Sequence, residues 1–232
     1  MAFPFFYQPN IITASSLLLS EETSKHCVQV LRMKQGERLQ LTDGKGNACV
    51  ASISKSDKRY CEVSIEASSF LPQPTRQISI GISLLKNAAR FEWFLEKAAE
   101  MGVTEIIPLL CNRTERQHFR FDRMQSIVIA AMLQSQQVWL PVLHQPTNIQ
   151  TTLQSSTEKQ KLIAHCEAGV KPTIATLSIS NAVQILIGPE GDFTLPEIDM
   201  AVQNNYHPVS LGNTRLRTET AGVVATALLV NA

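Results

Sequence analysis

Two glycine-containing segments carry the residue types best suited to ligand chemistry. The first, residues 187–193, reads Ile-Gly-Pro-Glu-Gly-Asp-Phe and follows an apolar run. Gly188 and Gly191 let the backbone turn sharply and present bare N–H and C=O groups to a ligand. Because Glu190 and Asp192 would repel a phosphate, and no Gly-Lys-Ser/Thr follows, the segment favours a neutral or cationic ligand. A tight turn with a surface acid is the alternative interpretation.

The second segment, residues 211–221, reads Leu-Gly-Asn-Thr-Arg-Leu-Arg-Thr-Glu-Thr-Ala. Arg215 and Arg217 stand beside an apolar run, and two guanidinium groups at a sheet edge suit a phosphate or a developing oxyanion. Thr218 is predicted to cap the helix that follows. Glu219 lies in the first turn of that helix, where a carboxylate complements the helix dipole, so this acid also has a purely structural interpretation.

Further candidates lie elsewhere in the chain. Four arginines are spaced by 3, 4 and 3 residues, which would place them on one face of a helix: Arg113, Arg116, Arg120 and Arg123. Aromatic side chains interleave with them and offer stacking surfaces for bases, so RNA contact is one interpretation and a solvated face paired with Glu115 and Asp122 is the other. The pair His165-Cys166 resembles half of a nucleophilic site, but burial is the favoured interpretation because the thiol has no orienting partner nearby in sequence. Trp93 is predicted to lie in the core.

The elements that must position these segments alternate between strand and helix from residue 77 onward. Strands are predicted at 78–85, 105–110, 161–165, 183–187 and 209–211, and helices at 90–101, 121–137, 195–204 and 218–230. This alternation predicts an α/β fold with a parallel sheet covered on both faces. Ligands of such sheets bind outside the carboxyl ends of the strands, so we expect the site just after Ile187 and Leu211.

The first 70 residues follow a different pattern. Period-2 runs at 39–42, 47–54 and 59–66 are separated by turn sequences such as Asp43-Gly44-Lys45-Gly46. They predict a small antiparallel sheet or barrel, preceded by a short helix around Cys27. The stretch at 70–74 contains two prolines, which are incompatible with a helix interior and with strand pairing. It is therefore the best linker candidate. The predicted domains are therefore 1–71 and 75–232.

The composition limits the classes of protein that the sequence can represent. Lys and Arg number 21 against 20 Asp and Glu, a net charge of +1, so any RNA contact would need a local patch. The longest apolar run, 221–230, is too short to span a membrane, and the first residues lack the pattern of a secretory signal. Five scattered cysteines without a C-x-x-C pair predict free thiols in a reducing cytoplasm and no metal site. The apolar helix at 218–230 must be buried on all sides, which suggests a homodimer.

The two segments together resemble the RsmE family, small-subunit ribosomal RNA uridine N3-methyltransferases of the SPOUT class. The matching stretches are Leu-Ile-Gly-Pro-Glu-Gly at 186–191, Leu-Gly at 211–212 and Leu-Arg-Thr-Glu-Thr-Ala at 216–221. Weaker matches lie at 97–103, at Pro108-Leu109 with Arg113, and at 30–32 with Gly36. The sequence departs from the family pattern at 133–137 and at 213–215.

The resemblance implies a small N-terminal PUA-like β-barrel for RNA contact and a C-terminal SPOUT domain with a deep trefoil knot, acting as a cytoplasmic homodimer without metal or membrane. It implies S-adenosyl-L-methionine as cofactor and N3 of a uridine in 16S ribosomal RNA as the acceptor. Arg217 and Glu219 carry over as the catalytic pair, with Glu219, or else Glu190, orienting Arg217 or accepting the proton. Cofactor contacts are expected from Leu186, Ile187, Gly188, Pro189, Glu190, Gly191, Leu211, Gly212, Leu216, Arg217 and Thr218. RNA contacts are expected from Arg32, Arg90, Arg113, Arg116 and Arg120.

Two other functions stay open. A SPOUT methyltransferase acting on another RNA position, such as a ribose 2′-hydroxyl, would share the same segments. A non-catalytic RNA-binding assembly factor would keep the fold without the activity. A nucleotide-dependent dehydrogenase is disfavoured, because neither the dinucleotide fingerprint nor a ribose-binding acid follows the first strand.

Overall fold

The chain folds into two units, which the computed structural model describes over residues 3–11, 15–57, 60–115 and 118–232. Unit 1 comprises Met1–Gln73 together with Met132–Leu140, and unit 2 comprises Pro74–Ala131 and Pro141–Ala232. The chain therefore passes between the units three times. Across the described ranges, no helix is long and apolar enough to cross a membrane.

Alternating side chains build the sheet of unit 1. Arg38–Thr42 (β3), Asn47–Ser56 (β4) and Cys61–Phe70 (β5) form an antiparallel ladder. Phe5–Tyr7 (β1) and Ser16–Leu18 (β2) extend it to the order β1-β3-β4-β5-β2. The inward side chains of the ladder are buried, among them Leu39, Leu41, Ala51 and Val63. The small sheet predicted for this region is confirmed.

A short helix precedes that ladder, as predicted. Glu21–Lys25 (α1) is capped by the Ser20 hydroxyl, which accepts from Thr23 N at 3.2 Å, and it continues as a π-helix over His26–Val30. The π-helix buries Cys27 in the core of unit 1. Arg32 follows it with φ +55°, an uncommon value for a residue with a side chain.

The segment 132–140 belongs to unit 1, although the sequence on both sides of it folds in unit 2. Trp139 Nε1 donates to the carbonyl oxygens of Leu71 at 3.0 Å and Pro72 at 3.2 Å, and Gly46 N donates to Val138 O at 2.9 Å. Gly46 has φ +91°, and a Cβ there would lie 2.6 Å from the Trp139 ring. Glycine is therefore required at this contact.

Unit 2 contains the parallel sheet that the strand–helix alternation predicts. Its strands are Gln77–Ser83 (β6), Glu105–Leu110 (β7), Val142–Leu143 (β8), Thr147–Asn148 (β9), Gln160–Ala164 (β10), Ala182–Ile187 (β11) and His207–Val209 (β12). Their order is β12-β10-β11-β6-β7-β8, with β9 also on β7, and every pair is parallel. The central strands are buried along nearly their whole length, as expected of a sheet covered on both faces.

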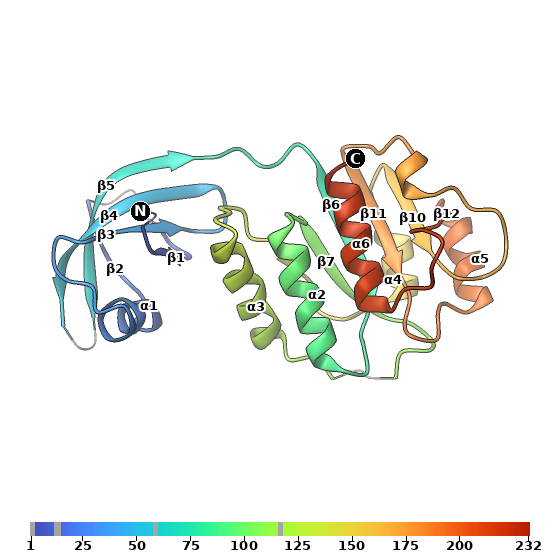
Figure 1. Ribbon diagram of the computed structural model, residues 1–232, viewed down its shortest axis with the longest axis horizontal. Coiled ribbons are helices and arrows are strands. Elements are labelled where there is room, and N and C mark those ends of the chain that lie inside the picture. The colour runs from blue at the N-terminus through green and yellow to red at the C-terminus, as the bar shows by residue number, and fades with distance from the viewer. Residues whose placement is uncertain (1–2, 12–14, 58–59, 116–117) are drawn as a thin grey trace. The chain divides into compact units, whose positions relative to one another are not determined.

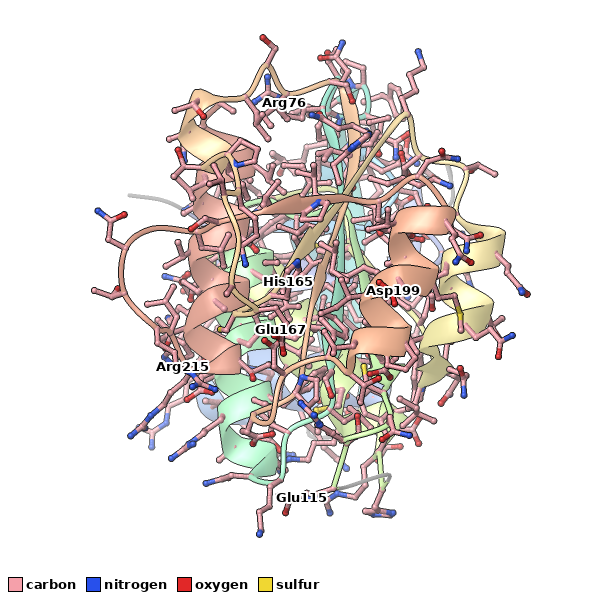
Figure 2. The ribbon with its side chains drawn as sticks, turned by 90° about the vertical axis from the view of Figure 1, so that its right-hand side faces the viewer. Arg76, Glu115, His165, Glu167, Asp199 and Arg215 are labelled. Carbon is pink, nitrogen blue, oxygen red and sulfur yellow. The ribbon has the colours of Figure 1, made fainter. Side chains whose placement is uncertain are left out.

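Helices cover the two faces of this sheet. Figure 2 shows Ala88–Glu100 (α2) and Thr218–Val230 (α6) on one side, and Ile149–Ser155 (α4) and Leu195–Gln203 (α5) on the other. Phe121–Gln134 (α3) and a 3-10 turn at Ile174–Thr176 complete the helical elements (Figure 1). A Cβ added to Gly222 of α6 would lie 2.6 Å from Phe94 Cε2 of α2, so the two helices touch closely.

Two predictions about local structure are wrong. The arginine run does not lie on one helical face, because α3 begins only at Phe121 and, of the described arginines in this run, only Arg123 is helical. Trp93 is not a core residue: 43% of it is exposed on α2. The short strands β8 and β9 and the polar helix α4 were not predicted, because elements this short carry almost no periodic signal.

Candidate active site

The carboxyl ends of three neighbouring strands meet at the site. Ala164, the last residue of β10, is in register with Ile187 of β11 and with Val209 of β12. The loops that start at His165, Gly188 and Ser210 therefore leave the sheet side by side. In Figure 2, Glu167 and Arg215 lie toward the lower end of the domain, which is this carboxyl edge, and Arg76 lies at the opposite end.

These loops enclose two adjoining cavities of about 320 and 480 Å³. Both volumes fall in the range of small-molecule sites. The walls that the two cavities share are Ala164, Cys166, Ile187, Arg215, Leu216 and Ala221. The predicted convergence of the bends after Ile187 and Leu211 is confirmed, because residues from both segments line the same space.

The smaller cavity is lined by carboxylates and guanidinium groups. Glu190, Asp192 and Arg217 line it together with Gly188, Pro189 and Thr218. Glu190 Oε1 accepts from Lys86 N at 3.3 Å, which holds this carboxylate beside the end of β6. The Arg217 side chain is exposed and makes no hydrogen bond or ion pair to another residue that the structure describes. Its guanidinium is therefore available to a ligand or substrate.

The larger cavity adds a third loop, residues 165–171, of which the sequence singled out only the pair His165-Cys166. Lys171 Nζ donates to the carbonyl oxygens of His165 at 2.7 Å and Glu167 at 2.6 Å, which closes the loop on itself. Leu211 and Gly212 form the opposite wall, and Gly212 has φ +145°, a conformation that side chains disfavour. A lysine that satisfies backbone carbonyls leaves no periodic pattern, so the role of Lys171 could not be predicted from the sequence.

Cys166 is exposed on the wall of both cavities, so its predicted burial is wrong. Its backbone N donates to Asp192 Oδ2 at 2.6 Å, and the other carboxylate oxygen accepts from Phe193 N at 2.8 Å. Asp192 therefore ties the loop after β11 to the loop after β10. All five cysteines of the chain are free thiols.

The surroundings of His165 favour the neutral form of its imidazole. Burial, and then the nearby Lys171 ammonium, lower the pKa of its imidazole below the usual 6.5, while Asp192 and Glu167 act weakly in the opposite direction. Lys171 Nζ lies 3.4 Å from His165 Nδ1, and Nε2 is buried without a hydrogen-bond partner in the described chain. The closed loop therefore disfavours a second proton on this ring.

This arrangement predicts a pH dependence. Because the folded state lowers the pKa of His165, its contribution to stability is fully present above about pH 6.5 and is lost as the pH falls through the folded-state pKa. We expect the melting temperature to fall less between pH 8 and pH 5.5 in His165→Gln than in the parent protein. His207→Gln, at an exposed histidine of β12, is the control; an equal fall in all three proteins would contradict the prediction.

Two predicted cofactor-contacting residues lie away from the cavities. The Leu186 side chain points into the core, where a Cβ on Gly81 would lie 2.6 Å from it. Gly191 is turned toward Arg113 and does not line either cavity. Thr218 lines the smaller cavity, but it is the first helical residue of α6 and Arg217 is the N-cap, so the predicted capping role of Thr218 is wrong.

Glu219 is not brought together with Arg217. Its side chain is only 8% exposed, and Oε1 lies 3.6 Å from Arg90 Nε of α2. Glu219 lines a separate cavity of about 340 Å³ with Arg90, Trp93, Ala89 and Thr220. Its Oε2 is buried and has no hydrogen-bond partner among the described residues. Glu190 and Asp192, not Glu219, are the carboxylates that share a cavity with Arg217.

The predicted RNA-contacting arginines differ in their surroundings. Arg90 faces Glu219, and Arg113 donates to backbone carbonyls of the loop after β11. Arg32 and Arg120 are exposed. Arg116 lies outside the described residues. Arg123, in the same sequence run, forms a two-pronged ion pair with Glu92, with Nε–Oε1 at 2.6 Å and Nη2–Oε2 at 2.7 Å.

The walls of the joined cavities suit a ligand with a flat apolar part and charged groups. Ile187, Leu216 and Ala221 supply apolar surface, Glu190 and Asp192 supply negative charge, and Arg215 and Arg217 supply positive charge. No group of three or more His, Cys, Asp or Glu side chains in the described ranges could hold a metal ion. S-adenosylmethionine, with an adenosine and a sulfonium cation, fits this donor set.

Comparison with known proteins points to the same chemistry. Residues 72–230 match a model of the RNA methyltransferase domain, and residues 19–66 match a model of the RNA methyltransferase PUA domain. A probable rRNA-methyltransferase from Porphyromonas gingivalis is 37% identical, with a TM-score of 0.89 and coverage of 97% of this chain and 95% of that one.

Two further relatives carry a more specific name. A ribosomal RNA small subunit methyltransferase E from Neisseria gonorrhoeae, solved bound to S-adenosyl methionine, is 30% identical, with a TM-score of 0.87 and coverage of 97% and 95%. The Rickettsia conorii protein of that name is 27% identical over 92% of this chain and 88% of its own length. With a domain model that spans most of the sequence and relatives that span nearly all of it, the chain belongs to the RsmE family of ribosomal RNA methyltransferases.

Proposed function

We propose that the protein transfers the methyl group of S-adenosyl-L-methionine to N3 of a uridine in 16S ribosomal RNA of the small subunit. The observation that carries the proposal is the crevice at the carboxyl ends of β10, β11 and β12, with the unpaired guanidinium of Arg217 on its wall. Cofactor bound there would supply an activated methyl group on a sulfonium. Ile187, Leu216 and Ala221 would pack on the adenosine, and Glu190 and Asp192 would balance the positive charge.

The protein's own groups must handle the uracil proton. N3 is an imide nitrogen and becomes nucleophilic only when its proton leaves, which spreads negative charge onto the neighbouring carbonyl oxygens. Arg217 stabilises that charge, because its guanidinium keeps its donors free. Glu190 accepts the proton, because both oxygens of Asp192, the other carboxylate on this wall, already accept from backbone N–H groups. The base must leave its stack to reach the crevice, which selects an accessible nucleotide.

Glu219 has a different role in this scheme. Its carboxylate is buried against Arg90, on the other side of the first turn of α6 from the cavity that Thr218 and Ala221 line. A carboxylate in that position anchors the start of α6, and so fixes where the N-cap residue Arg217 lies. It acts through Arg217 and does not touch the base.

The acting form is proposed to be a homodimer through α2 and α6. In a single chain, Trp93 is 43% exposed beside α6, and α6 is apolar on nearly all sides. The buried, unpartnered Oε2 of Glu219 lies in the same region and needs a donor. A second copy would cover this surface and supply that donor.

Substitution of Trp93 tests the dimer. We expect Trp93→Glu to convert the protein from dimer to monomer, because a carboxylate would replace an apolar contact at the centre of the interface. Sedimentation velocity measures the change. Val202→Glu is the matched control, since Val202 is an exposed apolar residue, 49% accessible, on α5 across the sheet. Equal sedimentation of all three proteins would remove α2 from the interface.

Two features of the fold extend the proposal. The chain leaves β12 at one edge of the sheet and returns to pack α6 against β6, beyond β10 and β11. On the way Ser210 bonds the loop after β10, with Ser210 N to Pro172 O at 2.9 Å and Ile174 N to Ser210 O at 3.1 Å. This path supports the deep trefoil knot of the SPOUT class.

The sheet of unit 1 is proposed as the barrel-like RNA-binding domain. Because the proposed substrate is ribosomal RNA, the enzyme is proposed to act in the cytoplasm.

Transfer of labelled methyl groups tests the proposed function. Purified protein, labelled S-adenosyl-L-methionine and small ribosomal subunits that lack modifications are incubated, and the nucleosides of the 16S rRNA are separated. We expect label in 3-methyluridine. Label in a 2′-O-methyl nucleoside would assign another position, and absence of cofactor binding by calorimetry would favour the assembly factor. Subunits that already carry their modifications are the control, because they offer no free acceptor.

A further inference from the structure

Arg113 occupies a turn that is fixed to the sheet independently of the cofactor crevice. The turn follows β7 and closes with Thr114 N donating to Cys111 O at 3.0 Å. The Thr114 hydroxyl lies 2.8 Å from Ser83 Oγ at the end of β6, and it accepts from Cys111 N at 2.9 Å. The backbone that carries Arg113 is therefore held between two strands of the parallel sheet.

From this fixed turn, the Arg113 side chain reaches the loop after β11. Its Nη1 donates to Gly191 O at 2.6 Å and lies 3.5 Å from Phe193 O. A Cβ on Gly191 would lie 3.3 Å from Arg113 Cδ, so glycine at that position makes room for the arginine stem. Hydrogen bonds from a permanently charged guanidinium to carbonyls are stronger than neutral ones.

A second bond attaches the same turn to the element that follows the loop. Asn112 N donates to Glu197 Oε1 at 2.7 Å, and Glu197 Oε2 accepts from Thr194 N at 2.8 Å in the capping box of α5. The loop is thus held on the β7 side by this turn and on the β10 side by the bond between Asp192 and Cys166. Gly188, Pro189 and Glu190, which form the cavity wall, lie between the end of β11 at Ile187 and the first of these attachments at Gly191.

We infer that Arg113 is a positioning residue for the cofactor loop rather than an RNA contact, and that it sets the cavity wall at 188–190 before the cofactor arrives. The inference rests on the proposed function for the identity of the ligand, but not for the conformation of the loop. A wall fixed in advance lowers the ordering cost of binding, so loss of Arg113 weakens cofactor binding without removing any group that touches the cofactor.

The experiment compares Arg113→Ala and Arg113→Lys with the control Arg120→Ala, an exposed arginine seven positions further on. Calorimetry without RNA measures the dissociation constant for S-adenosyl-L-methionine. Hydrogen exchange of the ligand-free protein measures the loop amides that are hydrogen-bonded, namely Asp192 N to Pro189 O, Phe193 N to Asp192 Oδ1 and Thr194 N to Glu197 Oε2.

We expect Arg113→Ala to raise the dissociation constant about tenfold to a hundredfold and to speed exchange at these amides. Arg113→Lys should recover part of both effects, because one ammonium can still reach Gly191 O. Arg120→Ala should leave both measurements unchanged. Unchanged exchange in Arg113→Ala, or an unchanged dissociation constant for the cofactor, would overturn the inference. If the parent protein binds no cofactor, the proposed function fails, and the exchange measurement still decides the role of Arg113.

Discussion

Arg217→Ala is expected to lower the rate of methyl transfer by about a hundredfold to a thousandfold, the usual cost of losing one donor that stabilises developing negative charge. The affinity for S-adenosyl-L-methionine should change by less than about threefold, because this side chain interacts mainly with the charge that develops in the transition state. Single-turnover kinetics on small subunits measure the first quantity, and calorimetry measures the second. Arg217 is suited to this role because it lines the cavity, is exposed and has no partner among the described side chains.

A second variant and the kinetic parameters distinguish between possible roles of Arg217. Arg217→Lys keeps the charge but loses the planar fork, so we expect only partial recovery of rate. If Arg217 instead holds a phosphate of the substrate, Arg217→Ala would raise KM for RNA and leave the maximal rate almost unchanged. Normal turnover in the alanine variant would remove Arg217 from the mechanism, and Glu190 alone would have to account for the chemistry.

The second large effect concerns folding. Gly222→Leu is expected to destabilise the protein by about 3 kcal/mol, the cost of overfilling a tightly packed core. Even a single Cβ at this position would lie 2.6 Å from Phe94 Cε2 and 2.8 Å from Ile82 Cδ1, and both of those side chains are fully buried. Chemical unfolding followed by far-ultraviolet circular dichroism measures the loss.

A smaller substitution, Gly222→Ala, gives a second test, because the sign of its effect on stability separates a packed helix from an open one. In an open helix, Gly→Ala stabilises by about 1 kcal/mol, because alanine has the higher helix propensity. We expect Gly222→Ala to destabilise instead. Combining Gly222→Leu with Phe94→Ala should cost less than the sum of the two single changes, because the smaller side chain leaves room for the larger one. A stabilising Gly222→Ala, or strict additivity, would show that α2 and α6 do not meet at this residue.

The position of the site could be predicted from the sequence because it follows from strand ends. The apolar run before Gly188 predicts a strand at 183–187, and the structure has it at Ala182–Ile187. The uninterrupted apolar helix at 218–230 begins and ends where it was expected. In a parallel sheet the loops after all strands leave from the same edge. The bend after Ile187 and the bend after Leu211, which leads into the helix at 218–230, must therefore lie at that edge.

The partners of the charged side chains could not be predicted in this way. Glu219 was expected to orient Arg217 because the two are close in sequence, but it faces Arg90 on a helix from the start of the domain. The spacing of the arginine run has meaning only on a helix, and the stretch around Arg113 is a turn. Lys171 closes its loop on backbone carbonyls, which every residue type offers. Such contacts depend on tertiary placement rather than on local pattern.

The segment 132–140 limits how the two units of the chain can be separated into fragments. Val138 and Trp139 complete the surface of the N-terminal sheet through Gly46, Leu71 and Pro72, yet they are encoded in the middle of the catalytic region. A fragment that ends near residue 73 would lack residues 132–140. The remaining fragment would contain these residues but expose them to water. A functional exchange of the PUA unit between homologues therefore has to include the distant nonapeptide along with the first 73 residues.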